Sequence, residues 1–207
     1  MRQIFDMDNP LMRTLSMVAD LLILNVLTMV CSLAVVTAGP ALTALYDRAL
    51  AMARQEDTYI IKPYFRAFKL NLKKGMLLGL LFLVLAALLY FDYYAARTYV
   101  PVLSPVIAGI AVLLLAILEY AFALLARYEN TLGGTLKNAV SLAIVYFPRT
   151  LAMVVFTLAL WLLSIQYFSW GSLVLLICGV SLPAFVNALL LRGVFAKLEA
   201  DDFQKGS

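Results

Sequence analysis

Residues 75–94, with the sequence GMLLGLLFLVLAALLYFDYY, form an apolar run of twenty positions in which Asp92 is the single charged side chain. A helix needs about 20 apolar residues to cross the hydrocarbon core of a bilayer, which is ~30 Å thick. The run therefore predicts a transmembrane helix. The whole chain has the same character, because hydrophobic residues occupy 64% of its 207 positions, whereas soluble domains use about 45–50%.

Four further runs of similar length bring the predicted spans to five, at residues 15–37, 75–94, 101–125, 150–168 and 171–191. A short sixth helix at 41–53 follows Gly39-Pro40, where the proline is placed for a first helical turn. Thr43, Asp47 and Arg54 recur there at helical spacing, so we expect a wetter side on a half-helix packed in the bundle or at its edge. The sequence predicts one all-α, polytopic transmembrane bundle over residues 1–207.

Two segments between the spans read as interfacial amphipathic helices. In residues 58–74 an apolar stripe of Tyr64, Phe65, Phe68 and Leu72 accompanies five basic residues, Lys62, Arg66, Lys69, Lys73 and Lys74. We expect this basic face to lie against anionic lipid headgroups, each cation contributing about 1 kcal/mol. An ordinary juxtamembrane linker is the alternative. The second segment is 132–147, and its end is marked by Pro148. The aromatic stripe and membrane flanks favour lipid over nucleic acid as partner.

The basic residues orient the bundle. Seven lie in residues 39–74, three in 127–149 and three after Leu191, whereas the two other connections hold one and none. By the positive-inside rule the three basic segments are cytoplasmic, and so is the C-terminus. If residues 41–53 return the chain, the N-terminus is cytoplasmic as well, which is the version we expect. Five spans alone would place it outside.

Polar side chains within the spans are candidates for a site, because they are costly in lipid. Asp20, Asn25, Glu119 and Asn187 are all expected in the cytoplasmic half of the membrane. We hypothesise that they line a polar cavity open to the cytoplasm, with Arg192 or Arg127 as a counter-charge. The alternative is that each forms a hydrogen bond to a neighbouring helix as part of packing.

The sequence offers few candidate catalytic residues. The chain contains no histidine, which excludes an imidazole base, a histidine-bound metal and a Ser-His triad. We find no metal-ligand cluster and no phosphate-binding loop, so we expect no metal, no cofactor and no enzymatic activity. Gly75 and Gly79 have GxxxG spacing, a weak indication of close helix packing.

Several strings in the first third of the chain are more specific. They are Phe5-x-x-Asp8-Asn9-Pro10-Leu11-x-Arg13, Ala19-Asp20-Leu21 with Asn25, Cys31-Ser32-Leu33, Val36-Thr37-x-Gly39-Pro40-Ala41-x-Thr43-Ala44-Leu45-Tyr46 and Phe65-x-x-Phe68-x-x-Asn71. Together they resemble the YesL-like family of bacterial membrane proteins, which is defined by a domain of unknown function. Thr37, Gly39, Pro40 and Thr43 of these strings are expected to form a structural turn after the first helix, where Gly39-Pro40 fixes a sharp reversal.

The resemblance implies a function. Members of the family are often encoded beside carbohydrate ABC-importer components and sensor kinases of Gram-positive bacteria. This implies an accessory or assembly role in carbohydrate uptake, with a permease or a sensor kinase as partner, and it supplies no catalytic residues. The alternative is a small-solute transporter that works through the polar cavity.

Overall fold

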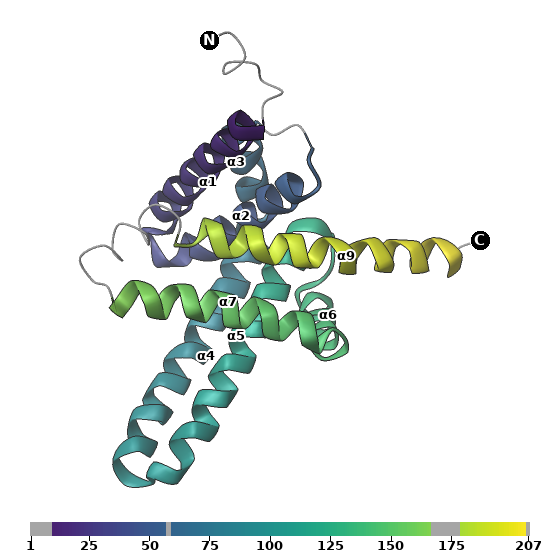
Figure 1. Ribbon diagram of the computed structural model, residues 1–207. Coiled ribbons are helices and arrows are strands. Elements are labelled where there is room, and N and C mark those ends of the chain that lie inside the picture. Colours follow the sequence, from purple (N-terminus) through teal and green to yellow (C-terminus); the bar gives the residue numbers. More distant parts are fainter. Residues whose placement is uncertain (1–9, 57–58, 167–178, 206–207) are drawn as a thin grey trace.

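The computed structural model describes residues 10–56, 59–166 and 179–205. The described residues contain helices and no strand, so the prediction of an all-α fold is confirmed. Figure 1 shows the helices, whose bounds are α1 Pro10–Ser32, α2 Ala38–Ala53, α3 Ile61–Leu70, α4 Leu72–Tyr99, α5 Ser104–Arg127, α6 Leu132–Val145, α7 Phe147–Gln166 and α9 Ser181–Lys205. Short 3-10 turns precede α2 and α5, at η2 Val35–Thr37 and η3 Pro101–Leu103.

Five of these helices are long and apolar enough to cross a membrane, at Thr14–Ser32, Leu72–Tyr99, Pro101–Arg127, Phe147–Ser164 and Ser181–Leu198. The chain is therefore a multi-pass membrane protein. The first helix ends at Ser32 instead of continuing to Thr37, and the last continues past Arg192. Hydropathy placed the end of this span at Leu191, because Arg192 follows, but one cation does not interrupt a helix. The predicted end of the fourth span and the predicted start of the fifth fall in residues 167–178, which lie outside the described residues. The motif residues Phe5, Asp8 and Asn9 lie outside them as well.

Helix α2 is the centre of the structure, since it packs against α1, α3, α4, α5 and α9. Most of its side chains are buried. The expectation of a wetter side was wrong at Thr43, which is fully buried and donates its hydroxyl to the Gly39 carbonyl oxygen at 2.9 Å. Asp47 is half-buried and pairs with Arg48 at 2.6 Å. Because other helices surround α2, little of its surface is left for water.

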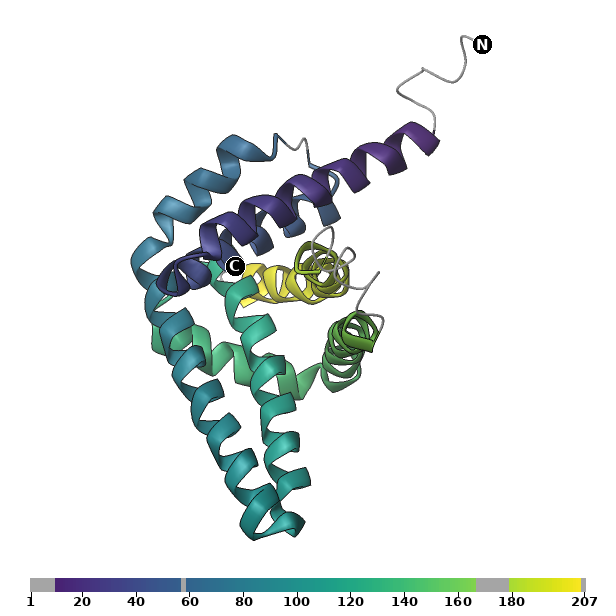
Figure 2. The same ribbon diagram turned by 90° about the vertical axis from the view of Figure 1, so that its left-hand side faces the viewer.

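Helices α4 and α5 form a hairpin that leaves the bundle. The two helices contact each other, and in Figures 1 and 2 their far ends, joined by η3, extend away from the remaining helices. Helices α7 and α9 lie side by side in both views and cross this hairpin steeply. The spans therefore lean in different directions and do not form a parallel four-helix arrangement.

The contact between α2 and α4 is made by glycines. A Cβ at Gly39 would overlap the Gly75 carbonyl oxygen, a Cβ at Gly75 would lie 2.8 Å from the Pro40 nitrogen, and a Cβ at Gly79 would lie 2.8 Å from the Gly39 Cα. The two backbones thus approach as closely as they do because side chains are absent. The turn between α1 and α2 comes before this crossing and is closed by the Thr37 hydroxyl, which donates to the Cys31 carbonyl oxygen at 2.5 Å. Gly39, Pro40 and Thr43 lie inside α2, so the expectation that Gly39-Pro40 makes the reversal was wrong.

Two hydrogen bonds bring the basic segments together. The Lys74 Nζ donates to the Asn130 carbonyl oxygen at 3.0 Å, and Arg192 Nη1 donates to the Ala53 carbonyl oxygen at 3.0 Å. The start of α4, the α5–α6 connection, the end of α2 and α9 therefore meet at one end of the bundle. The turn between α4 and α5 lies at the other end (Figure 1).

Adding one methyl group at the glycine crossing tests its role. Gly39→Ala and Gly79→Ala should each destabilise the protein by about 1–3 kcal/mol, because the new Cβ meets backbone that cannot move aside. In detergent, the apparent Tm should fall by roughly 3 °C or more.

Gly109→Ala is the matched control, since a Cβ there meets nothing within 4 Å. It should leave the Tm unchanged or raise it slightly, because alanine is the better helix former. Equal melting of all three variants would contradict the proposed role of the crossing.

Candidate functional site

A cluster of polar side chains lies where four helices meet. Glu119 of α5 is 3% exposed, and its Oε1 accepts a hydrogen bond of 2.7 Å from the Thr157 hydroxyl of α7. Asn187 of α9 is 1% exposed, lies next to the Glu119 carboxyl and donates from Nδ2 to the Tyr46 hydroxyl of α2 at 3.4 Å. We call Tyr46, Glu119, Thr157 and Asn187 the Glu119 cluster. It joins four helices by polar contacts.

Two acceptors in the Glu119 cluster have no partner. Glu119 Oε2 and Asn187 Oδ1 are both buried and form no hydrogen bond. Buried polar atoms are nearly always paired, and an orphaned one costs about 1–3 kcal/mol. The cluster can therefore accept further hydrogen bonds or positive charge.

Asn25 does not belong to the Glu119 cluster and instead caps the start of α9. It is fully buried on α1, and its Oδ1 accepts from the backbone nitrogens of Val180 at 3.0 Å and Ser181 at 3.2 Å. These nitrogens lie at the start of α9, where helix N–H groups have no partner within the helix. The buried amide of Asn25 thus ties α1 to the beginning of α9.

The five residues of the predicted polar cavity do not converge. Glu119 and Asn187 meet, whereas Asn25 caps α9, Asp20 is half-buried on α1 and Arg192 binds the Ala53 carbonyl oxygen. A cavity open to the cytoplasm would leave its lining accessible to water, yet Asn25, Glu119 and Asn187 expose at most 3%. The expected shared cavity is replaced by separate contacts between helices.

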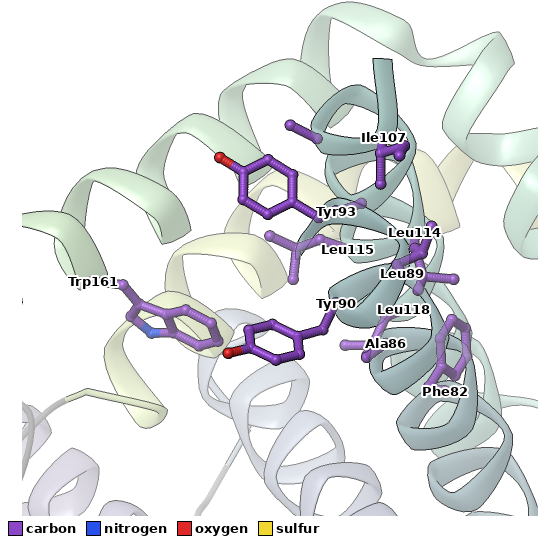
Figure 3. A pocket seen from close by; sticks show the side chains of 12 residues that line it. Phe82, Ala86, Leu89, Tyr90, Tyr93, Ile107, Leu114, Leu115, Leu118 and Trp161 are labelled. Atoms are coloured by element: carbon purple, nitrogen blue, oxygen red, sulfur yellow. The ribbon is translucent and has the colours of Figure 1, made fainter. Parts of the chain in front are cut away.

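The structure contains an apolar cleft that sequence reasoning missed. It lies along the α4–α5 hairpin and reaches Trp161 of α7, with a volume of about 520 Å³. Figure 3 shows Phe82, Tyr90, Tyr93 and Trp161 among the side chains that border it. Hydropathy marks all of these residues as membrane-embedded, but it carries no signal for a gap between helices.

Helix α3 presents a mixed surface. Tyr64 is turned inward and fully buried, and its hydroxyl donates to the Ala41 carbonyl oxygen at 3.4 Å. Burial raises the pKa of this phenol. The opposite face exposes the basic residues Lys62, Arg66 and Lys69 beside apolar Ile61, Phe65 and Leu70. The predicted apolar stripe is thus divided between the bundle and the outer face, and Lys73 and Lys74 belong to the first turn of α4.

The fold and these contacts define a multi-pass, all-α membrane protein whose interior polar groups link its helices. Residues 21–93 match the family model described as "Protein of unknown function, DUF624". This is the domain family that YesL-like proteins carry. The match runs from α1 into α4 and contains the glycine crossing. No curated protein and no solved structure matches the chain.

Substitutions at Glu119 test the cluster. Glu119→Gln retains a carbonyl acceptor for the Thr157 hydroxyl and keeps the size of the side chain, so its stability should be close to that of the wild type. Glu119→Leu removes the acceptor for the Thr157 hydroxyl and should lower the free energy of unfolding by about 1–3 kcal/mol. The measurement is the apparent Tm in detergent.

Asp92→Leu serves as the control, because Asp92 is an exposed acidic residue on the hairpin. Its Tm should stay close to that of the wild type. If Glu119→Leu were as stable as Glu119→Gln, the polar contacts of the cluster would have no part in holding the helices.

Proposed function

We propose that this chain is a non-enzymatic accessory protein of carbohydrate uptake in a bacterial plasma membrane, which assembles with an ABC-importer permease or with its sensor kinase. The match of residues 21–93 to the domain family of YesL-like proteins supports this assignment. The end of the bundle that gathers the three basic segments is taken as cytoplasmic, in accordance with the positive-inside rule.

The observation that carries the proposal is the burial of the interior polar groups. Asn25, Glu119 and Asn187 are used in contacts between helices and are almost inaccessible to water. A solute carrier needs polar groups that its substrate can reach, typically near the middle of the membrane. The geometry therefore favours a scaffold over the alternative of a small-solute transporter.

The α4–α5 hairpin is the surface that we assign to the partner. It leaves the bundle, so transmembrane helices of a permease can flank it without displacing any helix of this chain (Figures 1 and 2). Its outward side chains are large and apolar, as at Leu88, Phe91 and Val106. In lipid, such surfaces associate by van der Waals packing, because lipid itself supplies no hydrophobic drive between helices.

Helix α3 supplies the lipid contact in this arrangement. Its exposed lysines and arginine alternate with apolar side chains, the composition of helices that lie in the headgroup region. Tyr64 anchors the helix to α1 and α2, with its hydroxyl 3.4 Å from that of Thr28. The accessory protein would thus be held at a defined depth while the hairpin meets the permease.

Uptake measurements test this function. Deletion of the gene in its native host should lower uptake of a labelled oligosaccharide through the importer, and the wild-type gene should restore it. A triple Leu88→Ala, Phe91→Ala, Val106→Ala variant should fail to restore uptake although it reaches the membrane. The purified chain in proteoliposomes should pass no more of the sugar than empty vesicles do.

The matched control replaces exposed apolar residues of α1, with Leu15→Ala, Val18→Ala and Val26→Ala. This variant should restore uptake and co-purify with the permease under mild detergent. Sugar flux in proteoliposomes would instead establish a transporter, and uptake unaffected by the deletion would refute the accessory role.

A further inference from the structure

Three arginines that are far apart in the sequence border one cavity. Arg54, Arg127 and Arg192 line a space of about 270 Å³ together with Leu50, Phe195 and Ala196. We call it the arginine cavity. Arg192 or Arg127 was expected from the sequence to balance carboxylates in the membrane, and Arg54 was expected on the wetter side of the short helix. No carboxylate is among the described residues that line the cavity.

The three arginines come from the ends or the interior of three different helices. Arg54 follows the last residue of α2, Arg127 ends α5, and Arg192 lies within α9. Arg127 stacks over the Phe195 ring, with its guanidinium carbon 5.9 Å from the ring centroid. This distance is that of a cation–π contact. The cavity is therefore bordered by apolar side chains and by three guanidinium groups.

Arg192 is only partly used by the protein. One nitrogen donates to the Ala53 carbonyl oxygen at 3.0 Å, and the ion pairs among the described residues do not include Arg192. Arg54 is bound by Glu56 at 2.6 Å, but this pair is on the surface, where exchange with another anion costs little. The cavity thus gathers positive charge and still offers N–H donors.

We propose that the arginine cavity binds a phosphate group. Guanidinium forks bind phosphate oxygens in pairs, in a lipid phosphodiester as well as in a free phosphate. A phosphate monoester or free phosphate, with a charge near −2, matches several cations better than a carboxylate with a single charge. The cavity has room for the phosphate and part of its substituent. It lies at the end of the bundle where the basic segments meet, a position open to lipid headgroups and to phosphorylated solutes alike.

The experiment uses the full chain in two settings. Native mass spectrometry after purification in neutral detergent measures retention of phosphatidylglycerol against phosphatidylcholine. Calorimetric titration with inorganic phosphate, in phosphatidylcholine nanodiscs, measures binding of the free anion. The wild type should bind in at least one setting, and salt should weaken the binding because the contact is ionic. If the protein retains phosphatidylglycerol but does not bind inorganic phosphate, the ligand is a lipid headgroup. If it binds inorganic phosphate in the titration, the ligand is a soluble phosphate compound.

The variants are Arg192→Gln and the double Arg54→Gln, Arg192→Gln. Glutamine keeps an N–H donor for the Ala53 carbonyl oxygen, so folding should be preserved, as an unchanged Tm would show. Each substitution should weaken binding by about tenfold or more, the size expected for one charge-assisted hydrogen bond. Arg192→Lys retains the positive charge, so it should weaken binding less than Arg192→Gln does.

The control is the double variant Arg97→Gln, Lys137→Gln, which removes two exposed positive charges that lie outside the cavity and outside α3. It should bind as the wild type does. Equal weakening by this control would show a diffuse charge effect and overturn the proposal. So would the absence of binding in both settings by the wild type.

Discussion

The close approach of two backbones holds the fold together. Gly39 at the start of α2 meets Gly75 and Gly79 of α4, at distances that no side chain could share. Once α2 is seated in this way, α1, α3, α5 and α9 pack around it. Hydrophobic surface alone could not fix such a centre, because lipid tails are as apolar as the helices. Small residues decide which helices come together in a membrane.

Hydrogen bonds between buried side chains link further helices in addition to the glycine contact. Asn25 caps the start of α9 from α1, and Glu119 binds Thr157 across the α5–α7 contact. These side chains are expensive in lipid, so their presence demands a partner. The partners turn out to be neighbouring helices, which supports a role in assembly. The orphaned oxygens of Glu119 and Asn187 are the incomplete part of this network.

Much of the fold could be predicted because it depends on hydropathy. The apolar run at residues 75–94 is long enough to span a bilayer whatever its neighbours are, and it lies within α4. The site was less predictable. Matching depth along the chain brought Asp20 and Asn25 level with Glu119, but depth does not specify which face of a helix a side chain occupies. In the structure, Asp20 and Asn25 lie on helix faces that do not point toward Glu119.

The sequence by itself determined that the chain is helical, lies in a membrane and crosses it several times, because the length and apolarity of a segment act locally. Tertiary structure alone decided that α2 is buried at the centre and that the α4–α5 hairpin projects (Figure 1). It also decided that Arg54, Arg127 and Arg192 face one cavity. These features depend on contacts between residues distant in the chain, and only the packed arrangement of the helices brings such residues together.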